Sequence, residues 1–234
     1  EIGLGIPAEP LFRSKVLNGN AGSVHDYFLA QSYGQLDVTF EVVGPVTLSK
    51  NMASYGGNDS NGDDKNPAGM VYEAIKLAKQ QNPSLNFKDY DWNNDGEVDQ
   101  VYLIYAGYGE SSDEDGSLAN TIWPHEWQLS AANYKLSYDG VTIDTYGCSP
   151  ELLGNESYPV QMDGIGTACH EFSHCLGLPD LYDTSGSSNS AFGMDAWSLM
   201  DYGCYSDDGY KPTGYTSYER WMSGWLTPKR LTKP

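Results

Sequence analysis

The segment Cys169–Asp180, with the sequence CHEFSHCLGLPD, carries the strongest pattern in the chain. Residues four apart share one face of a helix, so His170 and His174 can present both imidazoles to a single metal ion. Gly177 can end that helix in a left-handed conformation, and Pro179 prevents its resumption. Asp180 then follows at a spacing that suits a third ligand. The segment therefore predicts a zinc site with three protein ligands and one open position.

Glu171 follows the first histidine directly, where its carboxylate can take a proton from a water bound to the metal. The alternative is a buried helix whose two histidines only satisfy local hydrogen bonds. The chain contains 4 histidines, and two of them fall in this frame, which favours metal binding. Asp183 could replace Asp180 as the third ligand, although the spacing favours Asp180.

A second segment, Ser198–Tyr202 (SLMDY), lies downstream of the predicted ligands. An HExxHxxGxxH motif followed by a Met-containing turn defines the metzincin class of zinc peptidases. The chain resembles a metzincin in which Asp180 replaces the third histidine. The resemblance implies that Met200 forms an apolar floor beneath the zinc. It also implies that Tyr202 hydrogen-bonds the tetrahedral intermediate.

The chain also resembles, over most of residues 20–228, the catalytic domain of the immune inhibitor A family of secreted bacterial metallopeptidases. Besides the two motifs above, the resemblance rests on SVHDYFLAQSYGQL at residues 23–36, IWPHEWQL at 122–129 and YTSYERWMSGWL at 215–226. It implies a location outside the cell or in the periplasm. Two departures stand out: Glu1–Asn20 has no apolar strand, and Ser173 replaces a common glycine, which we expect to be neutral.

The loop Asp91–Asp99 (DWNNDGEVD) follows the pattern of an EF-hand calcium loop, with Gly96 at its sixth position. Its predicted calcium ligands are the side chains of Asp91, Asn93, Asp95 and Asp99 and the backbone carbonyl of Glu97. Tyr102 stands where the bidentate glutamate is expected, so the segment is not a helix–loop–helix sensor. A structural calcium site ahead of a strand is predicted, and a solvated Asp/Asn turn is the alternative.

The composition narrows the classes of partner. Lys plus Arg number 13 against 32 Asp plus Glu, which gives a formal net charge of −19. Such a surface repels phosphate backbones and anionic lipid, so we expect no nucleic-acid partner. No apolar stretch approaches the roughly eighteen residues of a membrane span, so no membrane insertion is expected, and Glu1–Pro10 does not read as a signal peptide. The aromatic content of 13% excludes a disordered acidic tail.

The cysteines and the oligomeric state stay open. The 4 cysteines are Cys148, Cys169, Cys175 and Cys204, and they allow three disulfide connectivities or four buried thiols. Nothing in the sequence determines the oligomeric state.

The expected fold class is α+β, with a mixed α/β sheet, in a single metallopeptidase domain of residues 1–234. The resemblance implies a metzincin-like fold with a cleft between an N-terminal subdomain of about residues 1–177 and a C-terminal subdomain of about 178–234. Helices are expected at residues 23–33, 67–81, 165–176 and 216–225, strands at 37–48 and 98–106, a hairpin at 136–146, and loops at 58–66, 110–116 and 184–190.

The leading functional prediction is a zinc-dependent endopeptidase that hydrolyses peptide bonds in protein or peptide substrates. Two alternatives remain: a calcium-dependent binding module with a non-catalytic metal site, and another zinc hydrolase such as an amidase. The presence of Glu171 argues against the binding module, because a metal site kept only for structure needs no general base.

Overall fold

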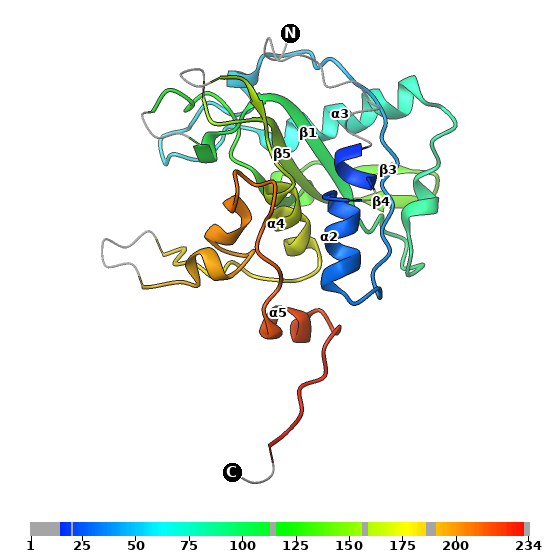
Figure 1. The fold of residues 1–234 in the computed structure, drawn as a ribbon. Helices are drawn as coiled ribbons and strands as arrows, with labels where there is room; N and C mark the ends of the chain where they lie inside the picture. Colours follow the sequence, from blue (N-terminus) through cyan, green and yellow to red (C-terminus); the bar gives the residue numbers. More distant parts are fainter. Residues whose placement is uncertain (1–14, 20, 113–115, 156–158, 186–190, 232–234) are drawn as a thin grey trace. The chain divides into compact units, whose positions relative to one another are not determined.

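The computed structural model describes residues 15–19, 21–112, 116–155, 159–185 and 191–231 (Figure 1). The chain forms two compact units. Unit 1 contains Glu41–Asp163, and unit 2 contains Ser14–Phe40 and Gly164–Pro234. The predicted metal-binding helix thus belongs to unit 2. The expected division near residue 177 stays a prediction.

Unit 1 is built on a mixed sheet, so the predicted mixed α/β class is confirmed. Strand β5 (Thr145–Leu153) pairs in parallel with β1 (Val101–Tyr108) and antiparallel with β2 (His125–Gln128). The short strand β6 (Gln161–Met162) pairs with the end of β5. Seven central positions of β5 are buried, which makes it the middle of the sheet, as Figure 1 shows.

Helix α3 (Pro67–Gln81) supplies much of the apolar core of unit 1, and its predicted bounds are confirmed. The Asn66 side chain caps its start by accepting a hydrogen bond from the backbone N–H of Gly69, and Pro67 occupies the first turn, where no N–H is needed. Its buried face joins side chains of the sheet in one cluster that includes Met70, Val71, Ala74, Ile75, Tyr105, Ile122 and Tyr146. Burial of these apolar groups is the main force that holds the helix on the sheet.

The predicted hairpin is confirmed as β3 (Leu136–Tyr138) and β4 (Val141–Ile143). Its two turn residues, Asp139 and Gly140, have φ angles of 55° and 87°. Positive φ at both central positions is the geometry of a type I′ hairpin turn.

The predicted strand at residues 37–48 is wrong. Within the part of the chain that the structure describes, the segment pairs with no strand, and Pro45 lacks the N–H that a strand would use. Instead, the side chain of Asn18 donates to the carbonyl of Phe40 and accepts from its N–H, both at 2.8 Å. One amide side chain thus takes the place of a neighbouring strand at that residue.

Other boundaries moved. The strand expected at residues 98–106 is β1, which begins and ends later than predicted. Of β5, only the part that overlaps the end of the expected hairpin was predicted as strand. The sequence did not predict β2 as a strand. Two of the expected loops include residues 113–115 and 186–190, which lie outside the described residues, as does most of Glu1–Asn20. Short 3₁₀ turns occur at Met52–Ser54, Phe87–Tyr90, Glu110–Ser112, Ser130–Ala132, Asp195–Trp197 and Tyr202–Tyr205.

Unit 2 contains the other three predicted helices, each shorter than expected: α2 (Val24–Gln31), α4 (Gly166–Cys175) and α5 (Ser217–Met222). Aromatic rings join α2 to α4, since Phe28 lies 5.0 Å from Phe172 and 6.3 Å from Tyr215, measured between ring centroids. The Ser23 side chain caps α2 by accepting from the N–H of Asp26. Among the residues that the structure describes, no helix is long and apolar enough to cross a bilayer.

Candidate metal centre

The first turn of α4 is fixed by a close backbone approach. A Cβ on Gly166 would lie 1.8 Å from the carbonyl oxygen of Cys204, so only glycine fits there. The N–H of Gly166 also donates to the carbonyl of Gly209 at 2.9 Å. The helix that carries the histidines is therefore anchored against the segment that follows the Met-containing turn.

Three side-chain atoms of unit 2 meet at one point. The Nε2 atoms of His170 and His174 lie 3.2 Å apart, and Oδ1 of Asp180 lies 3.3 Å and 3.2 Å from them. Metal–ligand bonds of 2.0–2.2 Å at tetrahedral angles place ligand atoms about 3.3–3.5 Å from one another. The triangle of observed distances therefore fits the three protein ligands of a tetrahedral zinc site.

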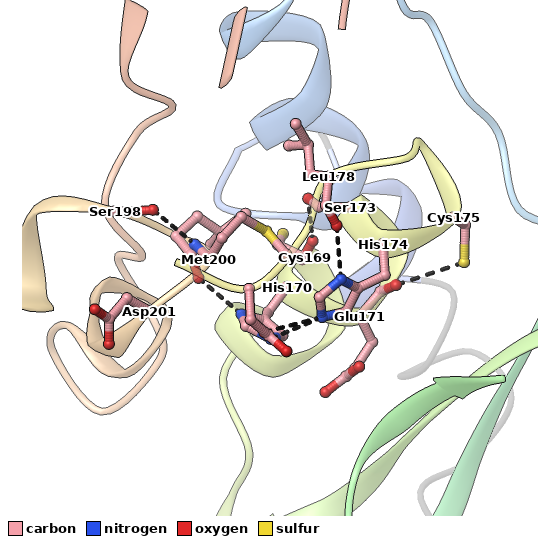
Figure 2. A network of polar contacts seen from close by, with 12 residues as sticks. Cys169, His170, Glu171, Ser173, His174, Cys175, Leu178, Ser198, Met200 and Asp201 are labelled. Atoms are coloured by element: carbon pink, nitrogen blue, oxygen red, sulfur yellow. Dashed lines mark hydrogen bonds and ion pairs between the residues drawn. The ribbon is translucent and has the colours of Figure 1, made fainter. Parts of the chain in front are cut away.

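The hydrogen bonds of the two imidazoles set which nitrogen faces this point. Nδ1 of His170 lies 2.8 Å from the carbonyl oxygen of Leu199, and Nδ1 of His174 lies 2.7 Å from that of Leu178 (Figure 2). A carbonyl only accepts, so each Nδ1 carries a hydrogen, and each Nε2 of the neutral rings presents a lone pair. Asp180 Oδ1 is buried and has no hydrogen-bond partner among the described residues. Three acceptors facing one another need a cation, and two imidazoles with one carboxylate suit zinc.

The electrostatics point the same way. Burial lowers the pKa of His170, but the Asp180 carboxylate and the neighbouring Cys204 raise it by more than burial lowers it. The resulting pKa of His170 is about 11. Burial raises the pKa of Asp180, and the two imidazoles more than reverse this, so that its pKa falls well below the usual range. The centre therefore favours positive charge, which a proton or a metal ion can supply.

The end of α4 orients the second histidine. Gly177 has a φ of 88°, and its N–H donates to the carbonyl of His174 while that of Leu178 donates to the carbonyl of Ser173. These two bonds form a Schellman motif, which reverses the chain after the helix. The carbonyl of Leu178 then accepts from His174 Nδ1. The predicted helix stop is confirmed, and it also holds a histidine ring.

The Met-containing turn holds the first histidine. Leu199, whose carbonyl accepts from His170, and Met200 are both fully buried. The carbonyl of Met200 accepts from the N–H of Leu181 at 2.8 Å, next to Asp180. The structure thus links the backbone of Met200 to the residue next to Asp180, while its neighbour Leu199 bonds to His170. The role of Met200 as an apolar floor under the metal stays a prediction.

The two predicted catalytic residues differ in their placement. Glu171 is buried, and one of its carboxylate oxygens lies within 4.8 Å of the donor atoms of His170 and His174. Tyr202 is 66% exposed and packs edge-on against Tyr205. The structure therefore groups Glu171 with the histidines, while the role predicted for Tyr202 stays a prediction.

Asp180 and Asp183, the two candidates for the third ligand, have different surroundings. The carboxylate of Asp183 accepts from the N–H groups of Ser185 and Ala191, at 2.9 Å and 2.6 Å, in the loop after the centre. Asp180 is the one that contacts both imidazoles. Sequence reasoning missed Tyr182, whose hydroxyl lies beside Asp180: burial and that carboxylate raise the pKa of the Tyr182 hydroxyl. Its separation of only two residues from Asp180 in the sequence was the available signal.

The loop predicted to bind calcium lies in unit 1 and forms a series of Asx turns. Asp91 accepts from the N–H groups of Asp95 and Gly96, and Asp95 accepts from that of Glu97. Asn93 also accepts from Asp95, and Asp99 accepts from Trp92. The side chains are therefore held by the loop backbone. Binding of calcium to this loop stays a prediction.

His125 and the four cysteines have contacts or states that the structure shows directly. His125 contacts the carbonyl of Trp123 through Nδ1 and the Tyr146 hydroxyl through Nε2, so it is a hydrogen-bonded structural histidine. All four cysteines are free, and three of them, Cys148, Cys169 and Cys204, are buried. No disulfide joins them.

Two imidazoles on one helix, with a buried glutamate next to the first, match the HExxH pattern of metal-dependent peptidases. Residues 11–230 match the family model described as immune inhibitor A peptidase M6, catalytic domain, and the chain belongs to this family. It is a metallopeptidase catalytic domain, as the sequence predicted.

Two named relatives match along most of the chain. The chain is 28% identical to the pre-pro-metalloprotease PrtV of Vibrio cholerae serotype O1 over 233 residues, which cover 90% of this chain and 25% of that protein. It is 27% identical to immune inhibitor A of Bacillus thuringiensis subsp. alesti over 207 residues, which cover 81% of this chain and 30% of that protein. The chain thus spans less than a third of the length of these relatives.

Ser173, whose replacement of a common glycine was expected to have no effect, makes two side-chain hydrogen bonds. Its hydroxyl donates to the carbonyl of Cys169 at 2.6 Å, so the Tyr215 hydroxyl, which also contacts it, is the donor in that second bond. Both residues are buried. The serine is therefore the acceptor that satisfies a buried phenol behind the metal-binding helix.

We predict that Ser173→Ala lowers the free energy of unfolding by about 1–3 kcal/mol, because the buried Tyr215 hydroxyl loses its acceptor. Tyr215→Phe removes that hydroxyl, so the double variant should be less destabilised than the sum of the single variants, by about 0.5–3 kcal/mol. Urea unfolding of the four proteins measures this difference. Strictly additive losses would show that the two hydroxyls do not interact.

Proposed function

We propose that this domain is a zinc-dependent endopeptidase that hydrolyses peptide bonds in protein substrates. The observation that carries the proposal is the triangle of three acceptor atoms from His170, His174 and Asp180, with Glu171 beside it. A zinc ion held by these residues supplies Lewis acidity toward the scissile carbonyl and lowers the pKa of water at the open position. Membership of a peptidase family supports the choice of peptide bonds.

Glu171 acts as the general base in this proposal. Its carboxylate accepts a proton from the attacking water and then passes it to the amine that leaves when the peptide bond breaks. The residue lies on the same helix as the two histidines and is 6% exposed, so the carboxylate is held near the metal ligands. A fixed base avoids the loss of orientational freedom that a mobile one would suffer at the transition state.

The finer roles remain part of the proposal. Tyr202 would stabilise the oxyanion, and its exposure leaves the ring accessible from solvent. Met200 would form the floor of the zinc site within a metzincin-like fold. The single domain of residues 1–234, with subdomains divided near residue 177, belongs to the same proposal.

We predict that Glu171→Gln lowers kcat for casein cleavage by about 10²–10⁴-fold, because the amide cannot accept the proton. The variant should keep its zinc, since the three ligands are intact. Asp208→Asn is the matched control, because it makes the same carboxylate-to-amide change at an exposed residue of unit 2. Undiminished cleavage by Glu171→Gln would remove the general-base role. A wild-type protein that binds zinc and does not cleave casein would point to the amidase alternative.

We predict that Asp180→Ala weakens zinc binding by more than the roughly 10–100-fold that is typical for loss of an outer-shell partner, because a direct ligand is lost. Asp183→Ala should leave the zinc dissociation constant unchanged, since Asp183 bonds to its own loop. Competition with a chromophoric chelator measures both constants. The opposite ranking of the two variants would assign the third ligand to Asp183.

We also propose that the loop of Asp91, Asn93, Asp95, Glu97 and Asp99 binds a structural calcium ion outside the cell or in the periplasm. The loop contacts β4, because the N–H of Val98 donates to the carbonyl of Thr142 and that of Thr142 to the carbonyl of Gly96. A loop that calcium holds in one conformation would therefore also stabilise the hairpin of unit 1 through these two hydrogen bonds. The formal net charge of −19 adds a general attraction for cations.

We predict that EGTA lowers the melting temperature by about 5–10 °C, because calcium at a hundredfold excess over its dissociation constant adds about 2.7 kcal/mol to a folded domain of this size. After the EGTA has been removed by dialysis, added calcium should restore the melting temperature and added zinc should not, since zinc prefers imidazole and thiolate ligands. Asp95→Ala should abolish the EGTA effect, and the exposed Asp63→Ala should preserve it. A dissociation constant of about 10⁻⁴–10⁻³ M would suit extracellular calcium. A melting curve that EGTA does not move would leave the loop a solvated turn.

A further inference from the structure

Glu219 is a buried carboxylate that the peptidase proposal does not use. It lies on α5 and is 1% exposed. A buried charge is retained only when its oxygens are bonded, and each oxygen of Glu219 has its own donor. Oε2 accepts from the N–H of Thr216 in a capping box, and Oε1 accepts from the Ser198 hydroxyl at 2.6 Å. The first bond caps the start of α5, and the second connects α5 to Ser198, which lies outside the helix.

Ser198 links Glu219 to the Met-containing turn. The residue is fully buried, and its Oγ accepts from the N–H of Met200 at 3.0 Å while donating to Glu219. Its own carbonyl accepts from the N–H of Gly203 at 2.9 Å. A Cβ on Gly203 would lie 2.3 Å from that carbonyl oxygen, so glycine is required for the approach. The hydroxyl of Ser198 is therefore held on both sides.

The turn that Ser198 holds carries two carbonyls that reach the metal centre. The carbonyl of Leu199 accepts from His170 Nδ1, and the carbonyl of Met200 accepts from the N–H of Leu181, next to Asp180. A shift of the turn would therefore rotate one imidazole and displace the chain at the carboxylate. Histidine ligands depend on such Nδ1 bonds for their orientation.

We propose that Glu219 is a positioning residue for the metal centre, acting through the Ser198 hydroxyl on the turn that orients His170 and the backbone at Asp180. The inference rests on the proposed function in so far as the groups positioned are the proposed zinc ligands. The bond to a carboxylate is charge-assisted, and such bonds are shorter and roughly twice as strong as neutral ones. Glu219 therefore restrains Ser198 more firmly than a neutral acceptor would.

The two bonds of Glu219 can be separated by mutation. Ser198→Ala removes the link to the turn and leaves the capping box in place. Thr216→Ala removes the hydroxyl that accepts from the N–H of Glu219, and so weakens the cap while leaving Ser198 bonded. Loss of such a cap costs about 1 kcal/mol of stability. Thr216→Ala is thus the control for an effect that acts only through the stability of α5.

The test is the zinc dissociation constant of the wild type, Ser198→Ala, Glu219→Ala, the double variant and Thr216→Ala, measured by chelator competition together with the melting temperature of each metal-free protein. We expect zinc binding to weaken about 10–100-fold in Ser198→Ala and in Glu219→Ala, and no further in the double variant, because both changes break one link. Thr216→Ala should melt at a lower temperature and bind zinc like the wild type.

Equal zinc affinity in Ser198→Ala and the wild type would overturn the positioning role. Weakening in Thr216→Ala that matches Ser198→Ala would also overturn it, because the effect would then be one of helix stability. If Glu219→Ala does not fold, the comparison of Ser198→Ala with Thr216→Ala decides alone. If the wild type binds zinc and cleaves no protein, the proposed function is wrong. The zinc dissociation constants of the variants would still decide whether Glu219 positions the metal ligands.

Discussion

The structure of unit 2 depends on one electrostatic constraint: three acceptor atoms lie close together at a partly buried site. The Nε2 atoms of His170 and His174 and one oxygen of Asp180 lie 3.2–3.3 Å apart. Without a positive charge, their lone pairs would repel one another in a medium that screens charge weakly. Such an arrangement persists only if the surrounding backbone holds each group firmly. The carbonyls of Leu178 and Leu199 provide that restraint for the two rings.

Much of this restraint comes from backbone motifs that also serve the fold. The Schellman motif ends α4 and turns the Leu178 carbonyl toward His174. The Met-containing turn closes on itself and directs the Leu199 carbonyl toward His170. Because each motif has two uses, a change that relaxes the fold at either place also relaxes the metal centre. Stability and ligand geometry are therefore coupled in unit 2.

Features held by residues close together in the sequence were predicted, and features held by contacts between distant residues were not. The metal-binding helix was predictable because its ligands and its stop lie within one short segment, where helical periodicity fixes their relation. The strand expected at residues 37–48 was wrong because Asn18, far along the chain, supplies the partner of Phe40. Strand β5 was largely missed because it is buried throughout and interrupted in sequence by Gly147 and Pro150, so it shows no alternation. The capping box of Thr216 and Glu219 was visible as a local pattern, whereas the bond from Glu219 to Ser198 was not.

The discontinuity of unit 2 in the sequence has a consequence for the order in which the protein is assembled. Ser14–Phe40 and Gly164–Pro234 form one unit, so Glu41–Asp163 is an excursion between two halves of the same core. During synthesis, α2 is made long before α4. The contact between Phe28 and Phe172 therefore cannot form until residues 41–163 have been translated. Glu41–Asp163 has an apolar core of its own, formed by α3 and the mixed sheet, so that core can form before α4 has been synthesised. The timing of its synthesis therefore sets when the metal centre can form.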